Sequence, residues 1–317
     1  MRFRNVYLGL VVLLVSLTLP VSAIEYQNDR KSLPAAKALV APYARSIGSV
    51  VLRNENSTTG SLDTTRCVGS VLTPSWILLA SHCAFAQSFA VKEARFVLSS
   101  EPDTPYVVDL AVLPKNRTQI KGDGTDRTST SRDIVNDYAL LRLQNPVPAA
   151  VPVTLCPGAY LPESAANNYL ARAVYFGTNT TEYSRFDSIL RPLLAGENIA
   201  YVTPNQVISD TTFGPADKFT QLWEGSGRKF NSSAESRFEQ GNSGSPVFLR
   251  PLGCQIGVIS YISTYRYRLD GEEAKIRADF AATLNADDQA WLEEVPALYS
   301  TLLRESIDLR QIPILEH

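Results

Sequence analysis

Short apolar runs separated by turn-forming residues repeat along most of this chain, and they limit it to a fold built from β-strands. Thr73-Pro74-Ser75, for example, separates the apolar residues 67–72 from the apolar residues 76–80. Apolar, β-branched runs bounded by such turn signals are typical of strands. The other runs that predict strands are 46–53, 94–98, 106–113, 138–143, 172–176, 199–202, 246–249, 255–261 and 274–280. So many short strands predict an all-β sandwich or barrel.

Two segments depart from the strand pattern. Near the end of the chain, Asp287 and Asp288 are suited to cap a helix. Pro296 lies inside this segment and predicts a break in the helix. The apolar positions of the helix are Ala290, Leu292, Val295, Leu298 and Leu302. Residues 115–136 are polar and rich in Thr, Arg, Asp and Gly, which predicts a long surface loop.

The N-terminus has the pattern of a secretory signal. Arg2 and Arg4 are followed by the mostly apolar residues 6–19 and by the small-residue site Val21-Ser22-Ala23. The alternative is a membrane anchor, but the uninterrupted apolar stretch 8–15 is too short to span a bilayer. We therefore expect residues 1–23 to be a cleaved signal peptide, with no membrane contact after cleavage.

Charge and cysteine content narrow the possible partners and the compartment. The 317 residues carry a net charge of −2, which gives no indication of nucleic acid or an anionic membrane as a partner. Export makes disulfides possible for the four cysteines, which are Cys67, Cys83, Cys156 and Cys254. Four cysteines allow three pairings, and the sequence alone does not choose among them.

His82 is the candidate base. The chain has two histidines, and His317 is the last residue printed, where disorder is expected. His82 ends an apolar run and precedes Cys83. A lone buried histidine is more often structural, but the position at a strand end favours catalysis. If this protein uses an imidazole base, the base must be His82.

Asp137 and Ser243 are the candidates to act with it. Asp137 precedes an apolar run, where a carboxylate is costly unless it is paired; alone it could be a turn or cap residue. Ser243 lies between Gly241-Asn242 and Gly244-Ser245. Glycines allow a tight turn and close approach of a substrate, and backbone N–H groups there can stabilise an oxyanion. An ordinary Gly-Ser turn is the alternative, and the combination with His82 and Asp137 makes it less favoured.

Together, Ser81-His82-Cys83, Asn136-Asp137-Tyr138-Ala139-Leu140-Leu141 and Gly241-Asn242-Ser243-Gly244-Ser245-Pro246 resemble the motifs of chymotrypsin-like serine proteases. The order His, Asp, Ser along the chain matches that family as well. The Gly-Asn-Ser-Gly-Ser-Pro form is closer to bacterial glutamyl-endopeptidase-like members than to trypsin. The resemblance covers roughly residues 46–303.

The resemblance implies a fold and a division of the chain. It implies two antiparallel six-stranded β-barrels with the active site in the cleft between them, and a C-terminal helix. The protease domain would be residues 46–303, after a signal peptide at 1–23 and a propeptide or N-terminal arm at 24–45. Residues 304–317 would form a C-terminal tail.

The resemblance also implies roles for individual residues. His82, Asp137 and Ser243 would be catalytic, and the N–H groups of Gly241 and Ser243 would form the oxyanion hole. The backbone of Ser260-Tyr261-Ile262 would pair with the substrate strand. Cys67 and Cys83 would form the disulfide that closes the histidine loop. Cys156 and Cys254 have no clear counterpart and either pair with each other or remain free.

Three departures from the family pattern affect activation and specificity. Asn242 replaces the acid that receives the freed N-terminus in trypsin-like enzymes, so we expect no trypsinogen-type switch. Phe238 stands where glutamyl-specific relatives carry a small hydroxyl residue, and no histidine lies near Ile259. Arg237 is a candidate to attract an acidic side chain, although a solvated ion pair with a neighbouring glutamate is the favoured interpretation.

The sequence thus predicts a secreted or periplasmic serine endopeptidase that acts as a monomer on a protein or peptide substrate. Neither a metal nor an organic cofactor is required for this chemistry. One alternative is a catalytically silent protease-fold protein that binds a partner, although such proteins usually lose a triad member. The other alternative is an esterase that uses the same triad.

Overall fold

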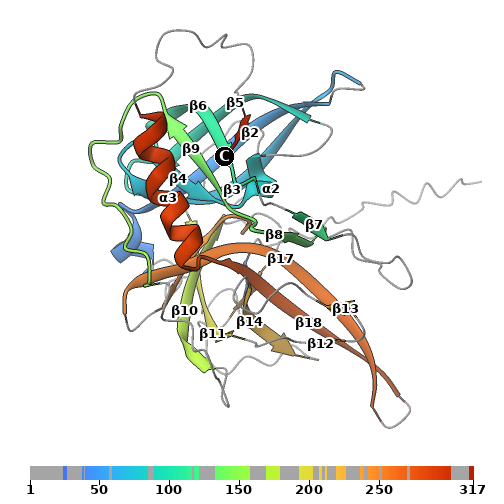
Figure 1. Cartoon of the computed structure of the whole chain (residues 1–317). Coiled ribbons are helices and arrows are strands. Elements are labelled where there is room, and N and C mark those ends of the chain that lie inside the picture. Colours follow the sequence, from blue (N-terminus) through green and yellow to red (C-terminus); the bar gives the residue numbers. More distant parts are fainter. Residues whose placement is uncertain are drawn as a thin grey trace, which may run out of the picture.

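The computed structural model describes the barrel strands, helices and some of the connections between them. The described residues are 24–26, 38, 40–56, 59–84, 89–115, 118–120, 133–157, 169–178, 193–202, 207–208, 211–212, 219–225, 236–238, 242–249, 252–269, 272–300 and 314–317. In this part of the chain, strands dominate and form two barrels, one above the other in Figure 1.

The N-terminal barrel closes through the pairing of its first and last members in the sheet order. That order is β6-β5-β2-β3-β4-β9, and β9 pairs back onto β6, so that six strands form a ring. The strands are β2 (Ile47–Asn56), β3 (Leu62–Thr73), β4 (Trp76–Leu79), β5 (Phe89–Leu98), β6 (Pro105–Leu113) and β9 (Ala139–Leu143). A short strand, β19 (Ile314–Glu316), adds to β6 in parallel orientation.

The C-terminal barrel is closed in the order β10-β11-β14-β18-β17-β16. Its strands are β10 (Tyr169–Thr178), β11 (Leu193–Val202), β14 (Phe219–Gly225), β16 (Pro246–Leu249), β17 (Cys254–Leu269) and β18 (Glu272–Thr283). The predicted architecture of two antiparallel six-stranded barrels with a C-terminal helix is therefore confirmed. Short two-stranded pairs lie outside the barrels: β1 (Ile24–Tyr26) with β15 (Ser236–Phe238), β7 (Thr118–Ile120) with β8 (Asp133–Val135), and β12 (Val207–Ile208) with β13 (Thr211–Thr212).

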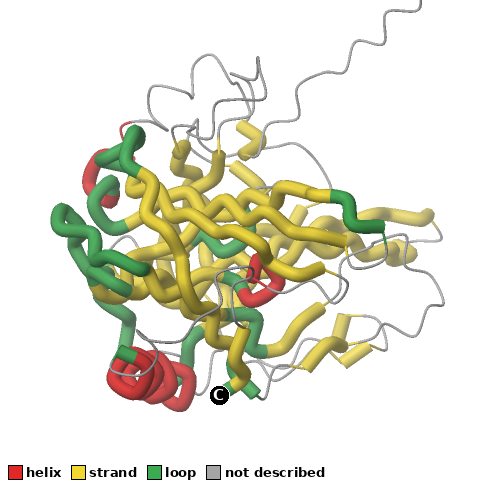
Figure 2. Tube along the Cα trace, turned by 90° about the horizontal axis from the view of Figure 1, so that it is seen from above, coloured by secondary structure: helices red, strands yellow, loops and turns green. Residues whose placement is uncertain are grey.

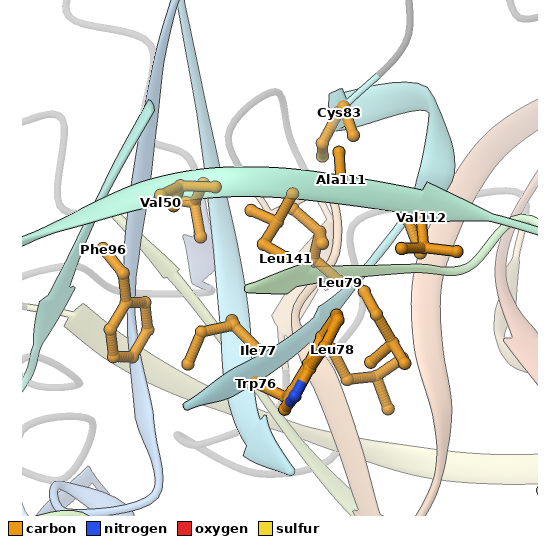
Figure 3. Packing of buried hydrophobic residues seen from close by; sticks show 14 of the residues in the cluster. Val50, Trp76, Ile77, Leu78, Leu79, Cys83, Phe96, Ala111, Val112 and Leu141 are labelled. Atoms are coloured by element: carbon orange, nitrogen blue, oxygen red, sulfur yellow. The ribbon is translucent and has the colours of Figure 1, made fainter. Parts of the chain in front are cut away.

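The apolar runs of the sequence become the most deeply buried strands. All four residues of β4 and all five residues of β9 are buried, and Figure 3 shows the side chains of β4 packed among those of neighbouring strands. Burying one large apolar side chain contributes roughly 1.5–3 kcal/mol. The turn predicted at Thr73-Pro74-Ser75 joins β3 to β4, and the Pro74 carbonyl accepts a hydrogen bond from Val147 N. The strand that precedes the His82 turn is thus held on both sides by the barrel.

Helix α3 (Ala286–Tyr299) lies along the side of the N-terminal barrel and at the margin of the strands (Figures 1 and 2). Its N-cap is Asn285 rather than the predicted aspartates, and Asp288 completes a capping box with it. The predicted break at Pro296 is wrong, because the helix continues to Tyr299. Arg142 donates a 2.9 Å hydrogen bond to the Tyr299 carbonyl and so stabilises the last turn.

His317 is ordered, contrary to the prediction. Its backbone N–H donates to the Leu113 carbonyl, and its carbonyl accepts from Lys115 N and from Trp291 Nε1. These hydrogen bonds extend the pairing of β19 with β6 and hold this end of the chain on the barrel. Among the described residues, no helix combines the length and the apolar character needed to cross a membrane.

The predicted loop at 115–136 is also partly regular. Its ends pair with each other as β7 and β8. Residues 121–132 between them lie outside the described part of the chain, as do residues 1–23 of the predicted signal peptide.

Candidate active site

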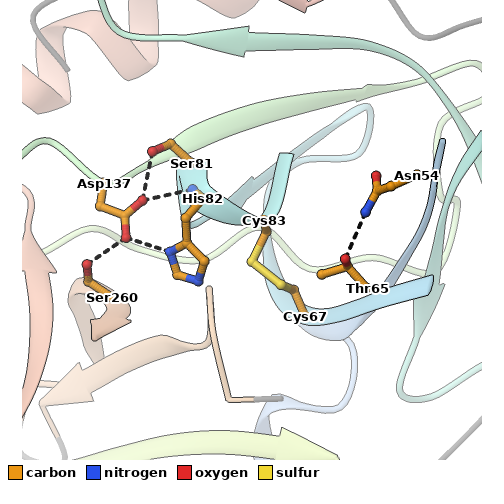
Figure 4. Close-up of a disulfide and its surroundings, with 8 residues drawn as sticks. All are labelled: Asn54, Thr65, Cys67, Ser81, His82, Cys83, Asp137 and Ser260. Carbon is orange, nitrogen blue, oxygen red and sulfur yellow. Dashed lines mark hydrogen bonds and ion pairs between the residues drawn. A yellow bond between two sulfur atoms is a disulfide. The ribbon is translucent and has the colours of Figure 1, made fainter. Parts of the chain in front are cut away.

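Asp137 is the centre of a buried hydrogen-bond network at the start of β9 (Figure 4). Its Oδ1 accepts hydrogen bonds from Ser81 Oγ at 2.7 Å and from His82 N at 2.9 Å. Its Oδ2 lies 2.7 Å from His82 Nδ1 and accepts a hydrogen bond from Ser260 Oγ at 2.6 Å. The side chain is 1% exposed. A carboxylate so deeply buried is tolerated because hydrogen bonds reach both of its oxygens.

The network favours the ionised form of Asp137. Burial by itself raises the pKa of this carboxyl, but the charge of His82 and the hydrogen bonds from His82, Ser260 and Ser81 outweigh it. The pKa of Asp137 therefore lies below its ordinary value. Asp137 is consequently negatively charged throughout the pH range in which an imidazole titrates.

His82 is positioned by the connection between β4 and a short helical turn, α2 (Ser81–Ala84). The Cys83 N–H donates to the Ala80 carbonyl, and a disulfide joins Cys83 to Cys67 on β3. The His82 side chain is 29% exposed, whereas Asp137 beside it is enclosed. An imidazole that directs its Nδ1–H at a carboxylate presents the Nε2 lone pair, as a general base must.

Ser243 lies in a tight turn that packs against β3 and against the residues just before His82. The Ser245 N–H donates to the Asn242 carbonyl across the turn, and Val68 N on β3 donates to the Ser243 carbonyl at 2.9 Å. Gly244 has a φ of 76°, and a Cβ atom there would lie 2.5 Å from the Val68 carbonyl oxygen and 2.9 Å from Ala80 N. Only glycine fits this close approach.

These backbone contacts bring the three predicted catalytic segments to one region. Val68 follows Cys67 of the disulfide, and Ala80 lies two residues before His82. The same turn is bound from the other side, because Gly244 N donates to the Ile259 carbonyl and Ile259 N donates to the Ser245 carbonyl. Ile259 precedes Ser260, which contacts Asp137.

Two functional side chains were missed by the sequence analysis. Ser260 was predicted only to present its backbone to a substrate, whereas its hydroxyl also donates to Asp137. It falls where the register of β17 against β18 shifts between Ile259 and Tyr261, and such a bulge re-aims a side chain. Ser81 precedes His82 directly, and this adjacency was the signal that could have identified it.

The other predicted site residues are only partly described. The backbones of Arg237 and Phe238 lie in β15, where they pair with Glu25 and Ile24 of β1. Tyr261 and Ile262 continue β17 and pair with Phe280 and Asp279 of β18. Gly241, predicted for the oxyanion hole, lies outside the described residues.

The remaining cysteines are also paired. Cys156 forms a disulfide with Cys254, which resolves the alternatives that the sequence left open. The pair joins the segment after the N-terminal barrel to the start of β17. Across the described residues, no group of three or more His, Cys, Asp or Glu side chains is placed to hold a metal ion.

The Cys67–Cys83 disulfide leads to the first testable prediction. Its cysteines are 16 positions apart, and closing a loop of that size is worth about 3 kcal/mol in the chain-entropy model. We expect the variant Cys67→Ala/Cys83→Ala to lose stability of this order in equilibrium unfolding by urea. An unfolding free energy within 1 kcal/mol of the unaltered protein (roughly the spread of ordinary substitutions) would contradict it.

Comparison with family models agrees with the fold. Residues 47–268 match the family model described as Trypsin. No curated protein sequence matches the chain. Among solved structures, the chain is similar to HL collagenase, with 16% sequence identity and a TM-score of 0.42. That alignment covers 80% of this chain and 94% of the collagenase chain.

Proposed function

This chain belongs to the trypsin family of serine peptidases, and from that premise we propose that it is a secreted or periplasmic endopeptidase with Ser243, His82 and Asp137 as its catalytic triad. The observation that carries the proposal is the enclosed Asp137 carboxylate, 2.7 Å from Nδ1 of a partly exposed His82. A structural histidine needs neither a buried anion nor an exposed edge. The histidine of a Ser-His-Asp triad uses both.

In the proposed mechanism, the Ser243 hydroxyl attacks the carbonyl carbon of the scissile peptide bond. His82 accepts the hydroxyl proton and then donates it to the leaving amine, which produces an acyl-enzyme. Water, deprotonated by His82, hydrolyses the ester and restores Ser243. Asp137 holds the imidazole in the required tautomer and stabilises its charged form.

The remaining roles follow from the family. The N–H groups of Gly241 and Ser243 would bind the oxyanion, and the Ser243 turn is already fixed by hydrogen bonds to Val68. The backbone of Ser260, Tyr261 and Ile262 would pair with the substrate as an added strand. Arg237 and Phe238 would contribute to the pocket for the substrate side chain.

The substrate subtype is proposed only in part. The Gly-Asn-Ser-Gly-Ser-Pro form is nearer to glutamyl-endopeptidase-like members, but Phe238 and the lack of a histidine near Ile259 argue against simple glutamate specificity. We therefore propose an endopeptidase of the trypsin family whose preference differs from both trypsin and those relatives.

Secretion is proposed from the N-terminal sequence and the disulfides. Disulfides persist in oxidising compartments outside the cytosol, and this chain has two. The segment 1–23, with its positive start and Val21-Ser22-Ala23, is the proposed signal peptide.

Digestion of a diverse peptide library, with cut sites identified by mass spectrometry, tests the proposal. We expect internal cuts with a consistent side-chain preference, and labelling of Ser243 by a fluorophosphonate. Hydrolysis of activated esters without any peptide cleavage would favour the esterase alternative. Absence of both reactions in folded protein would favour the silent binding protein.

Ser81 provides a prediction particular to this chain. Its hydroxyl donates to Asp137 Oδ1, so Ser81→Ala leaves more of the negative charge available to stabilise a protonated His82. Because catalysis needs neutral His82, we expect the acidic limb of kcat/KM to move to higher pH, with kcat lower by about tenfold.

The matched control for this variant is Ser70→Ala. Ser70 is equally buried and donates to the Leu78 carbonyl rather than to Asp137. Its replacement should leave the limb where it is. An unmoved limb in Ser81→Ala, or an equal shift in both variants, would count against a role for Ser81 at the carboxylate.

A further inference from the structure

The backbone of Phe176 on β10 is bonded by two side chains that flank the Ser243 turn. The Phe176 N–H donates to Ser245 Oγ at 2.7 Å, and the Phe176 carbonyl accepts a hydrogen bond from Asn242 Nδ2 at 3.0 Å. Phe176, Asn242 and Ser245 are all fully buried. The backbone of one residue of the C-terminal barrel is thus hydrogen-bonded by a residue on each side of Ser243 in the sequence.

These two hydrogen bonds stand where the pairing of β10 with β16 has stopped. Antiparallel β10 and β16 pair at Ala173 with Leu249 and at Val174 with Phe248. Carried two residues further, this register places Phe176 opposite Pro246, whose nitrogen has no hydrogen to donate. Pro246 therefore cannot donate to the Phe176 carbonyl, and Asn242 Nδ2 donates to it instead, while Ser245 Oγ accepts from the Phe176 N–H.

Packing around its ring holds Phe176 in place. Its ring contacts Tyr43 edge-on, with 5.3 Å between centroids, and Phe248 at 6.0 Å. Phe176 and Phe248 belong to a buried cluster that also contains Ile47 and Val68 of the N-terminal barrel, and the partly buried Tyr43 packs against it. Movement of Phe176 would therefore disturb packing between the barrels.

The chemistry of residue 242 is specific in this arrangement. An amide can donate to the Phe176 carbonyl, whereas an ionised carboxylate of the same shape offers only acceptor oxygens. An aspartate at position 242 would place a carboxylate oxygen against the Phe176 carbonyl oxygen, and neither of these two buried acceptors could donate a hydrogen bond to the other. Asn242 therefore donates to the Phe176 carbonyl as a neutral amide.

We propose that Asn242 and Ser245 are positioning residues that fix the Ser243 turn to β10 through the Phe176 peptide, and so keep the nucleophile in its reactive geometry. This inference rests on the proposed function, since it presupposes that Ser243 is the nucleophile. These hydrogen bonds, which fix the Ser243 turn to the barrel, join uncharged groups.

The test is the isosteric variant Asn242→Asp in the full chain, with a fluorophosphonate as the probe. The final extent of labelling counts folded molecules, and the second-order rate constant measures the reactivity of Ser243. We expect the rate constant at pH 8 to fall at least tenfold while the folded fraction labels to completion. The labelling rate constant of Asn242→Asp, divided by that of the unaltered protein, should rise as the pH falls, because a protonated carboxyl can again donate to the Phe176 carbonyl.

Gln255→Glu is the matched control. Gln255 is also fully buried and donates from Nε2 to a backbone carbonyl, that of Gly257, away from the Ser243 turn. This variant makes the same amide-to-acid change, so it should lower stability without changing the labelling rate constant. A purely structural role for Asn242 predicts that the two variants behave alike.

The outcomes separate the inference from the proposed function. No labelling of Ser243 in the unaltered protein would refute the proposed function. Labelling of Asn242→Asp at the unaltered rate constant, or equal slowing in Gln255→Glu, would overturn the positioning role alone. If Asn242→Asp does not fold, Ser245→Ala, which removes the acceptor for the Phe176 N–H together with the hydroxyl's own hydrogen bond to the Pro246 carbonyl, decides by the same rate constant.

Discussion

Ser243→Ala is expected to abolish peptide hydrolysis while leaving the fold intact. Loss of the nucleophile of a catalytic triad typically lowers kcat by about 10⁴-fold to 10⁶-fold. The contacts that fix the turn are made by the Ser243 carbonyl and by Gly244, and the substitution leaves both in place. The change in unfolding free energy should therefore stay within about 0.5 kcal/mol.

The measurement is turnover of a peptide substrate together with urea unfolding of the same preparation. Ser99→Ala is the control, because the Ser99 hydroxyl lies in the turn after β5 and makes no hydrogen bond that the substitution would remove. It should retain unaltered turnover. Wild-type turnover in Ser243→Ala would rule out the proposed mechanism, whereas a large loss of stability would mean that the hydroxyl supports packing.

Local sequence patterns predicted every barrel strand except β14, because an apolar run marks each of the others. The run Trp76-Ile77-Leu78-Leu79 is apolar at every position, and the structure buries every one of them. The turn before it is marked by Pro74. Such features depend on neighbouring residues alone, so a single sequence contains them.

Features that depend on distant residues could not be derived in this way. Nothing in β6 or β9 by itself indicates that they pair and close the N-terminal barrel, because each is an apolar run with one charged residue, and only the structure brings Asp109 and Arg142 together. The helix continues beyond Pro296, and its last carbonyls include that of Tyr299, which Arg142, far away in sequence, binds. In the same way, His317 is held by Leu113 and Trp291. In each case a tertiary contact outweighs the local preference.

The residues of the candidate site also fall into those that a local motif marks and those whose role depends on distant contacts. His82, Asp137 and Ser243 were recognisable because each lies in a short local motif. The donor role of Ser260 was not, because it arises from a bulge in β17 and from contact with a carboxylate 123 positions away. The contacts of Asn242 and Ser245 with Phe176 depend on where the pairing of β10 with β16 stops. No sequence signal marks that point except Pro246.

The acidic limb of kcat/KM is expected to fall near pH 6 to 7.5 and to belong to His82. An imidazole ordinarily titrates near pH 6.5. Asp137 remains ionised through this range because its pKa lies below its ordinary value, and its charge favours the imidazolium, while partial burial of the ring opposes it. Since catalysis requires the neutral imidazole, activity should rise with pH through the limb and be lost as the ring is protonated.

Two histidine variants assign this limb. His317→Ala should leave it unmoved, because His317 lies beside Tyr299 and Glu294 of α3 rather than at Asp137. His82→Ala should remove nearly all activity, and the small remainder should no longer show the limb. A limb that survived unchanged in His82→Ala would identify another group as the base. The triad would then be wrong even if Ser243 still carried the acyl group, and the hydrogen bonds around Asp137 would have to serve the fold alone.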